Sequence, residues 1–163
     1  MAFNILILCT GNSARSILGE ALFNHFGADR VRAFSAGSRP AGAVNPVALE
    51  TLAAHGIVVR DPRSKSWDEF AAPGAPEFDF IFTVCDSAAS EPCPIWPGHP
   101  TTAHWGMPDP AHVEPLPARR EAFEATYRRL ERRIRAFLAL PLESLSRNDI
   151  TAAARRIHTE AGL

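Results

Sequence analysis

The residue types best suited to chemistry lie in one short stretch near the start of the chain. Residues 9–16 read Cys-Thr-Gly-Asn-Ser-Ala-Arg-Ser and follow an apolar run over residues 3–8, which predicts a short buried strand. A helical pattern begins directly after them. A strand, a tight turn and a helix start gather backbone N–H groups around a small concavity that carries the positive potential of a helix N-terminus. The stretch therefore predicts a binding site for a tetrahedral oxyanion.

Each side chain in this loop has an expected part. Cys9 stands at the lip, where the same positive field should lower its pKa and leave a thiolate near neutral pH. Arg15 offers a planar fork of donors for two oxygens, and Ser16 is placed to donate a hydrogen bond to the thiolate. Gly11 and Asn12 are residue types that tolerate a left-handed backbone. The plainer alternative is a buried structural cysteine before an ordinary turn. The predicted oxyanion-binding residues are Thr10, Gly11, Asn12, Ser13, Ala14, Arg15 and Ser16.

Strands and helices alternate along the chain with short links. The apolar patterns predict strands at 3–8, 31–35, 78–85 and 101–105. They predict helices at 14–26, 45–56, 119–140 and 149–159, with a helical turn at 66–70. Residues 106–117 carry four prolines and are predicted to be irregular. We expect an α/β protein, a small doubly wound fold with a four-stranded parallel sheet in the order 2-1-3-4 and helices on both faces.

This topology predicts a meeting of two cysteines that lie far apart in the sequence. Cys9 follows the first strand and Cys85 ends the third, and neighbouring strands run about 4.8 Å apart. Cys93 follows in a segment rich in Pro, Ser and Ala. The alternatives are that Cys85 and Cys93 are inert loop residues, or that the three thiolates bind a metal. Because the chain has no C-x2-C pair and no cluster of histidines, we predict no metal.

Length and charge exclude several classes of protein. The chain has 163 residues, enough for one domain with a substantial core. Its net charge of −1, from 17 basic and 18 acidic residues, predicts binding to neither nucleic acid nor an anionic membrane. Neither a membrane span nor the basic start of a signal peptide is recognisable, and three cysteines do not make a disulfide framework. We therefore expect a cytoplasmic protein, where thiols stay reduced.

Four segments together resemble the low-molecular-weight tyrosine phosphatase superfamily, and more narrowly its thiol-coupled arsenate reductases. They are the 9–16 loop, Ser35-Ala36-Gly37 at a strand end, Asn45-Pro46, and His104-Trp105-Gly106 with Asp109-Pro110 after it. The resemblance covers about residues 4–138. It implies a phosphatase-like catalytic domain over residues 1–140, with 141–163 as a helical extension of the same domain. It also implies Cys9 as the nucleophile, Arg15 as the clamp and Asp109 as the acid. Asp86 is the rival acid, and Asp109 could merely shape a turn.

Two features favour a reductase over a phosphatase. Reducing arsenate needs two electrons, which Cys85 and Cys93 could help supply, whereas a phosphatase needs one thiol. Ala111 also stands where the phosphatases carry an aromatic residue after Asp-Pro. The resemblance then implies that Cys9 attacks arsenate, Cys85 attacks Cys9 and releases arsenite, and Cys93 attacks Cys85. Thioredoxin, glutaredoxin or a low-molecular-weight thiol would regenerate the enzyme, and phosphate or sulfate would compete with arsenate.

No cofactor is expected. Some relatives hold a potassium ion through residues matching Asn12, Glu20 and Ser35, but a lysine follows Ser64 where a later acidic ligand is expected, so we predict no ion here. Two other functions stay open. One is a low-molecular-weight protein tyrosine phosphatase whose extra thiols protect Cys9, and the other is a non-catalytic module that binds an oxyanion or arsenite.

Overall fold

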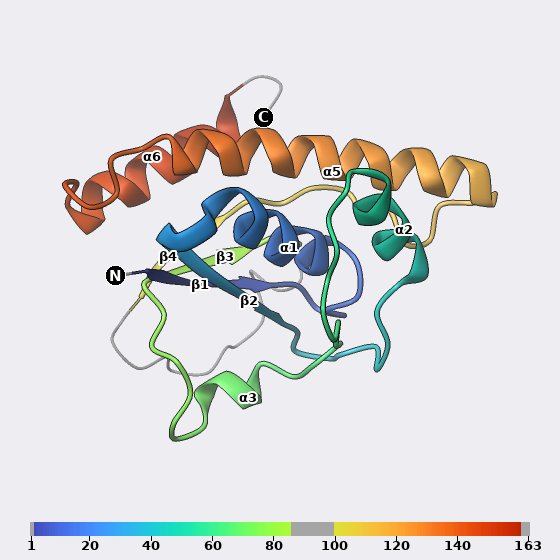
Figure 1. The fold of residues 1–163 in the computed structure, drawn as a ribbon, viewed down its shortest axis with the longest axis horizontal. Helices are drawn as coiled ribbons and strands as arrows, with labels where there is room; N and C mark the ends of the chain where they lie inside the picture. The colour runs from blue at the N-terminus through green and yellow to red at the C-terminus, as the bar shows by residue number, and fades with distance from the viewer. Residues whose placement is uncertain (1, 86–99, 161–163) are drawn as a thin grey trace.

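The sheet has four strands, all parallel. The computed structural model describes residues 2–85 and 100–160 of the chain. Strand β1 (Phe3–Leu8) pairs with β2 (Val31–Ala36) and with β3 (Phe80–Thr83), and β3 pairs with β4 (Thr101–His104). The resulting order, β2-β1-β3-β4, confirms the predicted doubly wound topology (Figure 1). Because Leu8 lies beside Thr83 in the register, the segments after β1 and β3 leave the same edge of the sheet side by side.

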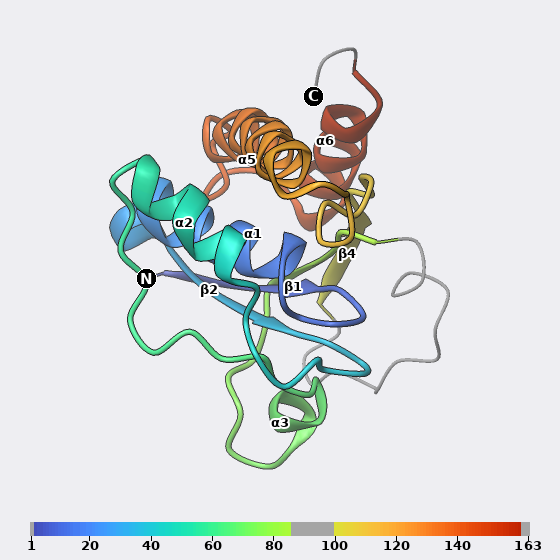
Figure 2. The same cartoon turned by 90° about the vertical axis from the view of Figure 1, so that its right-hand side faces the viewer.

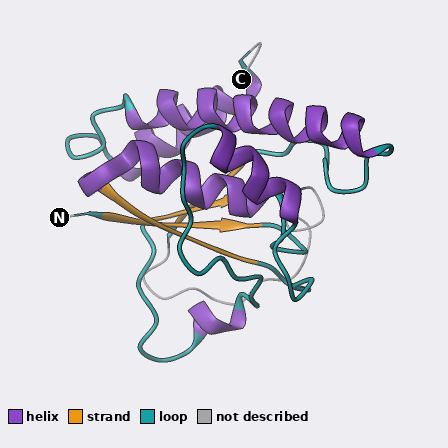
Figure 3. Ribbon diagram, turned by 45° about the vertical axis from the view of Figure 1, so that its right-hand side comes forward, coloured by secondary structure: helices purple, strands orange, loops and turns teal. Residues whose placement is uncertain are grey.

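Helices cover the two faces unequally. One face carries α1 (Arg15–Gly27), α2 (Pro46–Ala54), α5 (Leu116–Leu138) and α6 (Arg147–Thr159), whereas the short α3 (Asp68–Ala71) lies across the other face (Figures 2 and 3). The one-turn helix η1 (Ala28–Arg30) joins α1 to β2. The predicted helices on both faces are confirmed. Within residues 2–85 and 100–160, none of the helices combines the length and apolar composition needed to cross a membrane.

Side chains of β1 alternate between two apolar cores. Ile5 and Ile7 face the larger helical layer, and Leu6 and Leu8 face the smaller core around α3. Apolar residues on both faces are typical of parallel sheets, which are buried from both sides. Phe82 is central to the larger core, with ring centroids 4.2 to 5.5 Å from its aromatic neighbours. These are Trp105, Phe137 and Phe23. The two cores fix the edge of the sheet from which the loops of the site emerge.

The boundaries of several elements differ from the sequence-based prediction by a few residues, among them those of α5, α6 and β3. Helix α5 begins at Leu116 rather than 119, because a proline in the first helical turn removes only an N–H that has no partner in the helix. Helix α6 begins at 147, since Ser146 accepts a hydrogen bond from the N–H of Asp149 and caps the helix. Strand β3 is shorter than the predicted 78–85. The segment 86–99, which contains Cys93 and Asp86, lies outside the described residues.

Candidate active site

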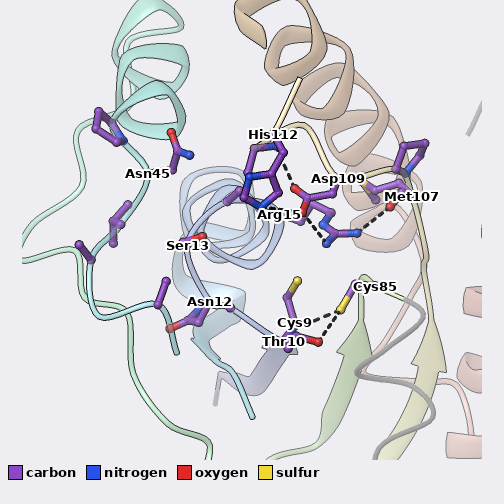
Figure 4. A pocket seen from close by; sticks show the side chains of 18 residues that line it. Cys9, Thr10, Asn12, Ser13, Arg15, Asn45, Cys85, Met107, Asp109 and His112 are labelled. Carbon is purple, nitrogen blue, oxygen red and sulfur yellow. Dashed lines mark hydrogen bonds and ion pairs between the residues drawn. The ribbon is translucent and has the colours of Figure 1, made fainter. Parts of the chain in front are cut away.

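A cavity of about 800 Å³ opens where β1 and β3 end. Figure 4 shows Cys9 and Cys85 close together on one side, with Arg15 and Asp109 beyond them and Asn45 across the opening. The lining comes from the 9–15 loop, from the segment before α2, from Cys85 and from the segment after β4. Its residues are Cys9, Thr10, Gly11, Asn12, Ser13, Ala14, Arg15, Ala41, Ala43, Val44, Asn45, Pro46, Cys85, Met107, Pro108, Asp109, Ala111 and His112.

The loop backbone is arranged as an anion cradle. The carbonyls of Thr10, Gly11 and Ser13 accept hydrogen bonds of 2.9 to 3.0 Å from the segment that leads to α2. The donors are the N–H groups of Arg39, Ala41 and Asn45. Because the N–H and C=O of a peptide point in opposite directions, carbonyls turned outward favour N–H groups turned inward. The first turn of α1 also has no side-chain cap, so its N–H groups can serve an anion in the cavity.

Asn12 shapes this loop from below. Asn12 has a φ of 45°, the left-handed region that its residue type tolerates, whereas Gly11 does not enter that region. Its buried amide donates to the hydroxyls of Ser16 (2.8 Å) and Ser35 (3.0 Å), and its oxygen accepts the N–H of Lys65 (2.9 Å). Ser16 is therefore a buried hydrogen-bond acceptor behind the loop and lies outside the cavity lining. The hydrogen bond that the structure gives the Ser16 hydroxyl is the one from Asn12, in place of the predicted bond to the Cys9 thiolate.

A pair of opposite charges lies next to the same network. The side chain of Lys65 is buried, and its ammonium donates to the carbonyl of Arg63 at 3.3 Å. Burial raises the pKa of Glu20, while the charge of Lys65 and a hydrogen bond from Ser35 oppose the rise. Burial lowers the pKa of Lys65, and Glu20 opposes that shift. The charge of each side chain therefore offsets part of the pKa shift that burial causes in the other. Among the described residues, no group of three or more His, Cys, Asp or Glu is placed to hold a metal ion.

We expect Lys65→Met to lower the free energy of unfolding by roughly 2 kcal/mol at pH 8, because it leaves a partly buried carboxylate without its partner. The loss should be smaller at pH 5. Removing Lys65 raises the pKa of Glu20 further, and a carboxyl group whose folded-state pKa is raised loses stability as the pH rises through that pKa. Urea unfolding at both pH values measures the effect. The control is the double variant with Glu20→Gln, which should recover most of the loss. Equal losses in the single and double variants would contradict the pairing.

The two thiols at the cavity form a coupled pair. Cys9 and Cys85 are 5% and 3% exposed, so water can solvate a thiolate there only weakly. Thr10 donates its backbone N–H to the sulfur of Cys85 at 3.3 Å. The pKa of the Cys9 thiol is raised, first by the neighbouring thiol of Cys85 and then by burial, while Arg15 and the N–H of Gly11 act to lower it. The expected low pKa of Cys9 is therefore wrong for this pair, because a second thiol lies against the first.

Replacing Cys85 with Ala should lower the pKa of Cys9, since it removes the largest of the influences that raise it. The rate of alkylation of Cys9 by iodoacetamide, followed against pH, measures the shift. The midpoint of the profile should move to lower pH by about one unit or more, which is about 1.4 kcal/mol. The matched control is Cys93→Ser, which keeps Cys85 in place and should leave the midpoint of Cys9 unchanged. Coincident profiles for the Cys85→Ala variant and the parent would refute the coupling.

Arg15 joins the loop to the segment after β4. Its Nη1 donates to the carbonyl of Met107 at 2.9 Å, and its Nη2 lies 3.5 Å from Oδ2 of Asp109. Its Nε is buried and has no hydrogen-bond partner within the described part of the chain. Asp109 is held in turn by the N–H of Ala111, at 2.9 Å. The structure thus brings Cys9, Cys85, Arg15 and Asp109 to one cavity and leaves a donor of Arg15 available to an anion.

Two parts of the lining were not expected from the sequence. His112 lies at the rim, with Nε2 4.0 Å from Oδ2 of Asp109, and nothing in its spacing marks it out. The wall opposite the thiols is built from small apolar residues just before α2, which reach the cavity because the loop carbonyls bind their backbone. These are Ala41, Ala43, Val44 and Pro46.

Comparison with known proteins agrees with this geometry. The model of the family described as low molecular weight phosphotyrosine protein phosphatase matches residues 4–150. The chain belongs to this phosphatase family. An arsenate reductase from Shouchella clausii is 37% identical over 110 residues, which make up 68% of this chain and 76% of that protein. The predicted resemblance to the arsenate reductases of the phosphatase family is therefore confirmed.

Solved structures of the phosphatase family share the fold. The crystal structure of an arsenate reductase from Archaeoglobus fulgidus has a TM-score of 0.59 at 28% identity, covering 80% of this chain and 98% of that one. The tyrosine phosphatase Wzb from Escherichia coli K30, in complex with sulphate, has a TM-score of 0.67 at 22% identity, covering 85% of this chain and 97% of that one. Both branches of the family thus share this architecture.

Proposed function

We propose that this protein is a cytoplasmic arsenate reductase that converts arsenate to arsenite. The observation that carries the proposal is that two buried cysteines, Cys9 and Cys85, line the same oxyanion cavity. Hydrolysis of a phosphate ester needs one nucleophile, whereas reduction of arsenate needs an electron pair, which a second thiol beside the first can deliver. The curated relatives named arsenate reductases support the same reading.

The cradle supplies the binding step. Arsenate is a tetrahedral oxyanion, and the inward N–H groups of the 9–15 loop together with Nε and Nη2 of Arg15 are donors suited to its oxygens. Binding would replace part of the contact between Arg15 and Asp109, because the guanidinium turns toward the stronger anion. Phosphate and sulfate have the same shape and compete for the same donors.

The first covalent step is an attack of Cys9 on arsenic, in which the thiol proton of Cys9 passes to an oxygen of the bound arsenate. A sulfur–arsenic bond forms, and one arsenic–oxygen bond breaks as Asp109 gives a proton to the leaving oxygen, so that water departs. Cys85 then attacks the sulfur of Cys9, and its thiol proton passes to an oxygen of the departing arsenic group. The sulfur–sulfur bond forms, the sulfur–arsenic bond breaks, and its electron pair stays on arsenic, which leaves as arsenite. The pair of thiols is oxidised by two electrons and arsenic is reduced by two.

Cys93 completes the cycle in this proposal. Its thiolate attacks Cys85, frees Cys9 as a thiol and leaves a Cys85–Cys93 disulfide, with no net change in electrons. An external dithiol protein such as thioredoxin or glutaredoxin, or a low-molecular-weight thiol, then reduces that disulfide. A reducing cytoplasm keeps such a cycle supplied with electrons.

The test is arsenite formation from arsenate by the intact protein, with reduced thioredoxin, glutaredoxin and a low-molecular-weight thiol supplied in parallel. Without reductant, we expect about one arsenite per protein and the loss of two thiols. Mapping that disulfide to Cys85 and Cys93 would support the full cascade, and the reductant that restores turnover would be the partner. Brisk hydrolysis of para-nitrophenyl phosphate without any arsenite would instead make the protein a phosphatase. Arsenate binding with neither product would make it a binding module.

A further inference from the structure

One arginine of α5 is buried although its helix carries most of its arginines on the exposed face. Arg133 is 3% exposed, whereas Arg128 is on the solvent side of α5 and pairs with Glu124. Burial and the nearby charge of Arg129 lower the pKa of Arg133 to about 10, which still leaves the guanidinium charged at neutral pH. A buried charge is costly unless it makes hydrogen bonds, so the contacts of Arg133 indicate what it holds.

Those contacts go to the segment that leads to Asp109. Nη1 of Arg133 donates to the carbonyl of Trp105 at 2.9 Å and to that of Gly106 at 3.3 Å. The next carbonyl, that of Met107, accepts from Arg15 at 2.9 Å. Three consecutive carbonyls are therefore held by two arginines, one from the long helix and one from the anion cradle. Asp109 follows two residues later.

Helix α6 holds the same segment from its other side. The indole N–H of the fully buried Trp105 donates to the carbonyl of Ala154 at 2.8 Å. The ring of His158 packs against the ring of His104, which ends β4, with 5.7 Å between the two ring centroids. Helix α6 thus contributes contacts directly behind the segment that carries Asp109.

We propose that Arg133 is a positioning residue, which together with α6 fixes residues 105–109 so that Asp109 faces Arg15 and Cys9 in the cavity. Arg133 acts through the backbone and does not touch the substrate. Helix α6, in the predicted extension, is then a working part of the catalytic domain. The inference rests on the proposed role of Asp109 as the proton donor, but its structural half can be measured without any turnover.

The test compares Arg133→Met, Arg133→Lys and the control Arg128→Met in the full chain. Deuterium exchange of the peptide over residues 105–113 is the first readout, since the N–H groups of Ala111 and Val113 are hydrogen-bonded within it. We expect Arg133→Met to speed this exchange by about tenfold or more, which is about 1.4 kcal/mol of local opening. Residues 9–16 should keep their exchange rates. Arg133→Lys should restore part of the protection, and Arg128→Met should change nothing.

The second readout is the single-turnover loss of thiols with arsenate. Arg133→Met should lower the maximal rate of thiol loss by roughly 10- to 100-fold, because a displaced Asp109 is a poorer general acid. The arsenate concentration that gives half of this rate should change by less than about threefold. Unchanged exchange over 105–113, or faster exchange throughout the chain, would overturn the proposal. If Arg133→Met does not fold, Arg133→Lys and Trp105→Phe must still loosen 105–113 selectively. An inactive parent protein would refute the proposed function, while the exchange measurement would still decide the role of Arg133.

Discussion

The Cys85→Ala variant will form the adduct between Cys9 and arsenate but release arsenite at least about a thousandfold more slowly than the parent, as expected when the nucleophile of a step is removed. The reason is the position of Cys85, which lines the cavity beside Cys9 and is held there by the backbone N–H of Thr10. Without that thiol, no neighbouring group in the described cavity can attack the Cys9 sulfur. Rapid mixing with arsenate, followed by mass measurement of the intact protein and an arsenite assay, separates the two steps.

Cys93→Ser is the matched control for this prediction. It keeps Cys9 and Cys85, so it should release one arsenite per protein and stop as a Cys9–Cys85 disulfide. Binding of arsenate should be preserved in both variants, because the cradle and Arg15 are untouched. Multiple turnovers by the Cys85→Ala variant would show that the electrons take another route, and the proposed cascade would be wrong.

The fold follows from patterns that are local in the sequence. The apolar runs and helical periods locate all four strands and the long helices, because the two cores demand apolar residues on both faces of β1 and β3. The right-handed crossovers typical of parallel strands limit the orders in which these strands can lie, and the observed order is one of those. The start of α5 was misplaced for a local reason, since prolines that break a helix interior are tolerated in its first turn.

The candidate site was predictable in its residues and less so in its electrostatics. The spacing of Cys9 and Arg15 and the position of Cys85 after a neighbouring strand were enough to bring them to one cavity. The direction in which the pKa of Cys9 shifts could not be predicted, because it depends on which neighbour lies against the buried thiol. The contacts of Lys65 with Asn12 and of Arg133 with Trp105 join segments far apart in the sequence, and no local pattern signals them.

Gly37→Ala should lower the free energy of unfolding by about 3 kcal/mol, the upper end for forcing a methyl group into a packed interior. A Cβ at Gly37 would lie 2.4 Å from the carbonyl oxygen of Thr10 and 2.6 Å from that of Cys9. Both are backbone atoms of the cradle, so no side chain can rotate away to make room. Gly37 cannot retreat easily either, because its N–H donates to Lys65 and its carbonyl accepts from Trp67. Urea unfolding measures the loss of stability.

The same substitution should weaken arsenate binding by about tenfold or more, because the displaced peptides carry the N–H groups of Thr10 and Gly11, which hold the sulfurs of Cys85 and Cys9 at the cavity. Gly19→Ala is the control. There the added Cβ meets only the side chain of Ile7, at 3.3 Å, and Ala favours the interior of a helix by about 1 kcal/mol over Gly. We therefore expect stability near that of the parent and unchanged binding for Gly19→Ala, measured by calorimetric titration with arsenate. If Gly37→Ala binds arsenate as tightly as the parent, the cradle tolerates displacement of its first two peptides, and the anion is held mainly by Arg15 and the helix N-terminus.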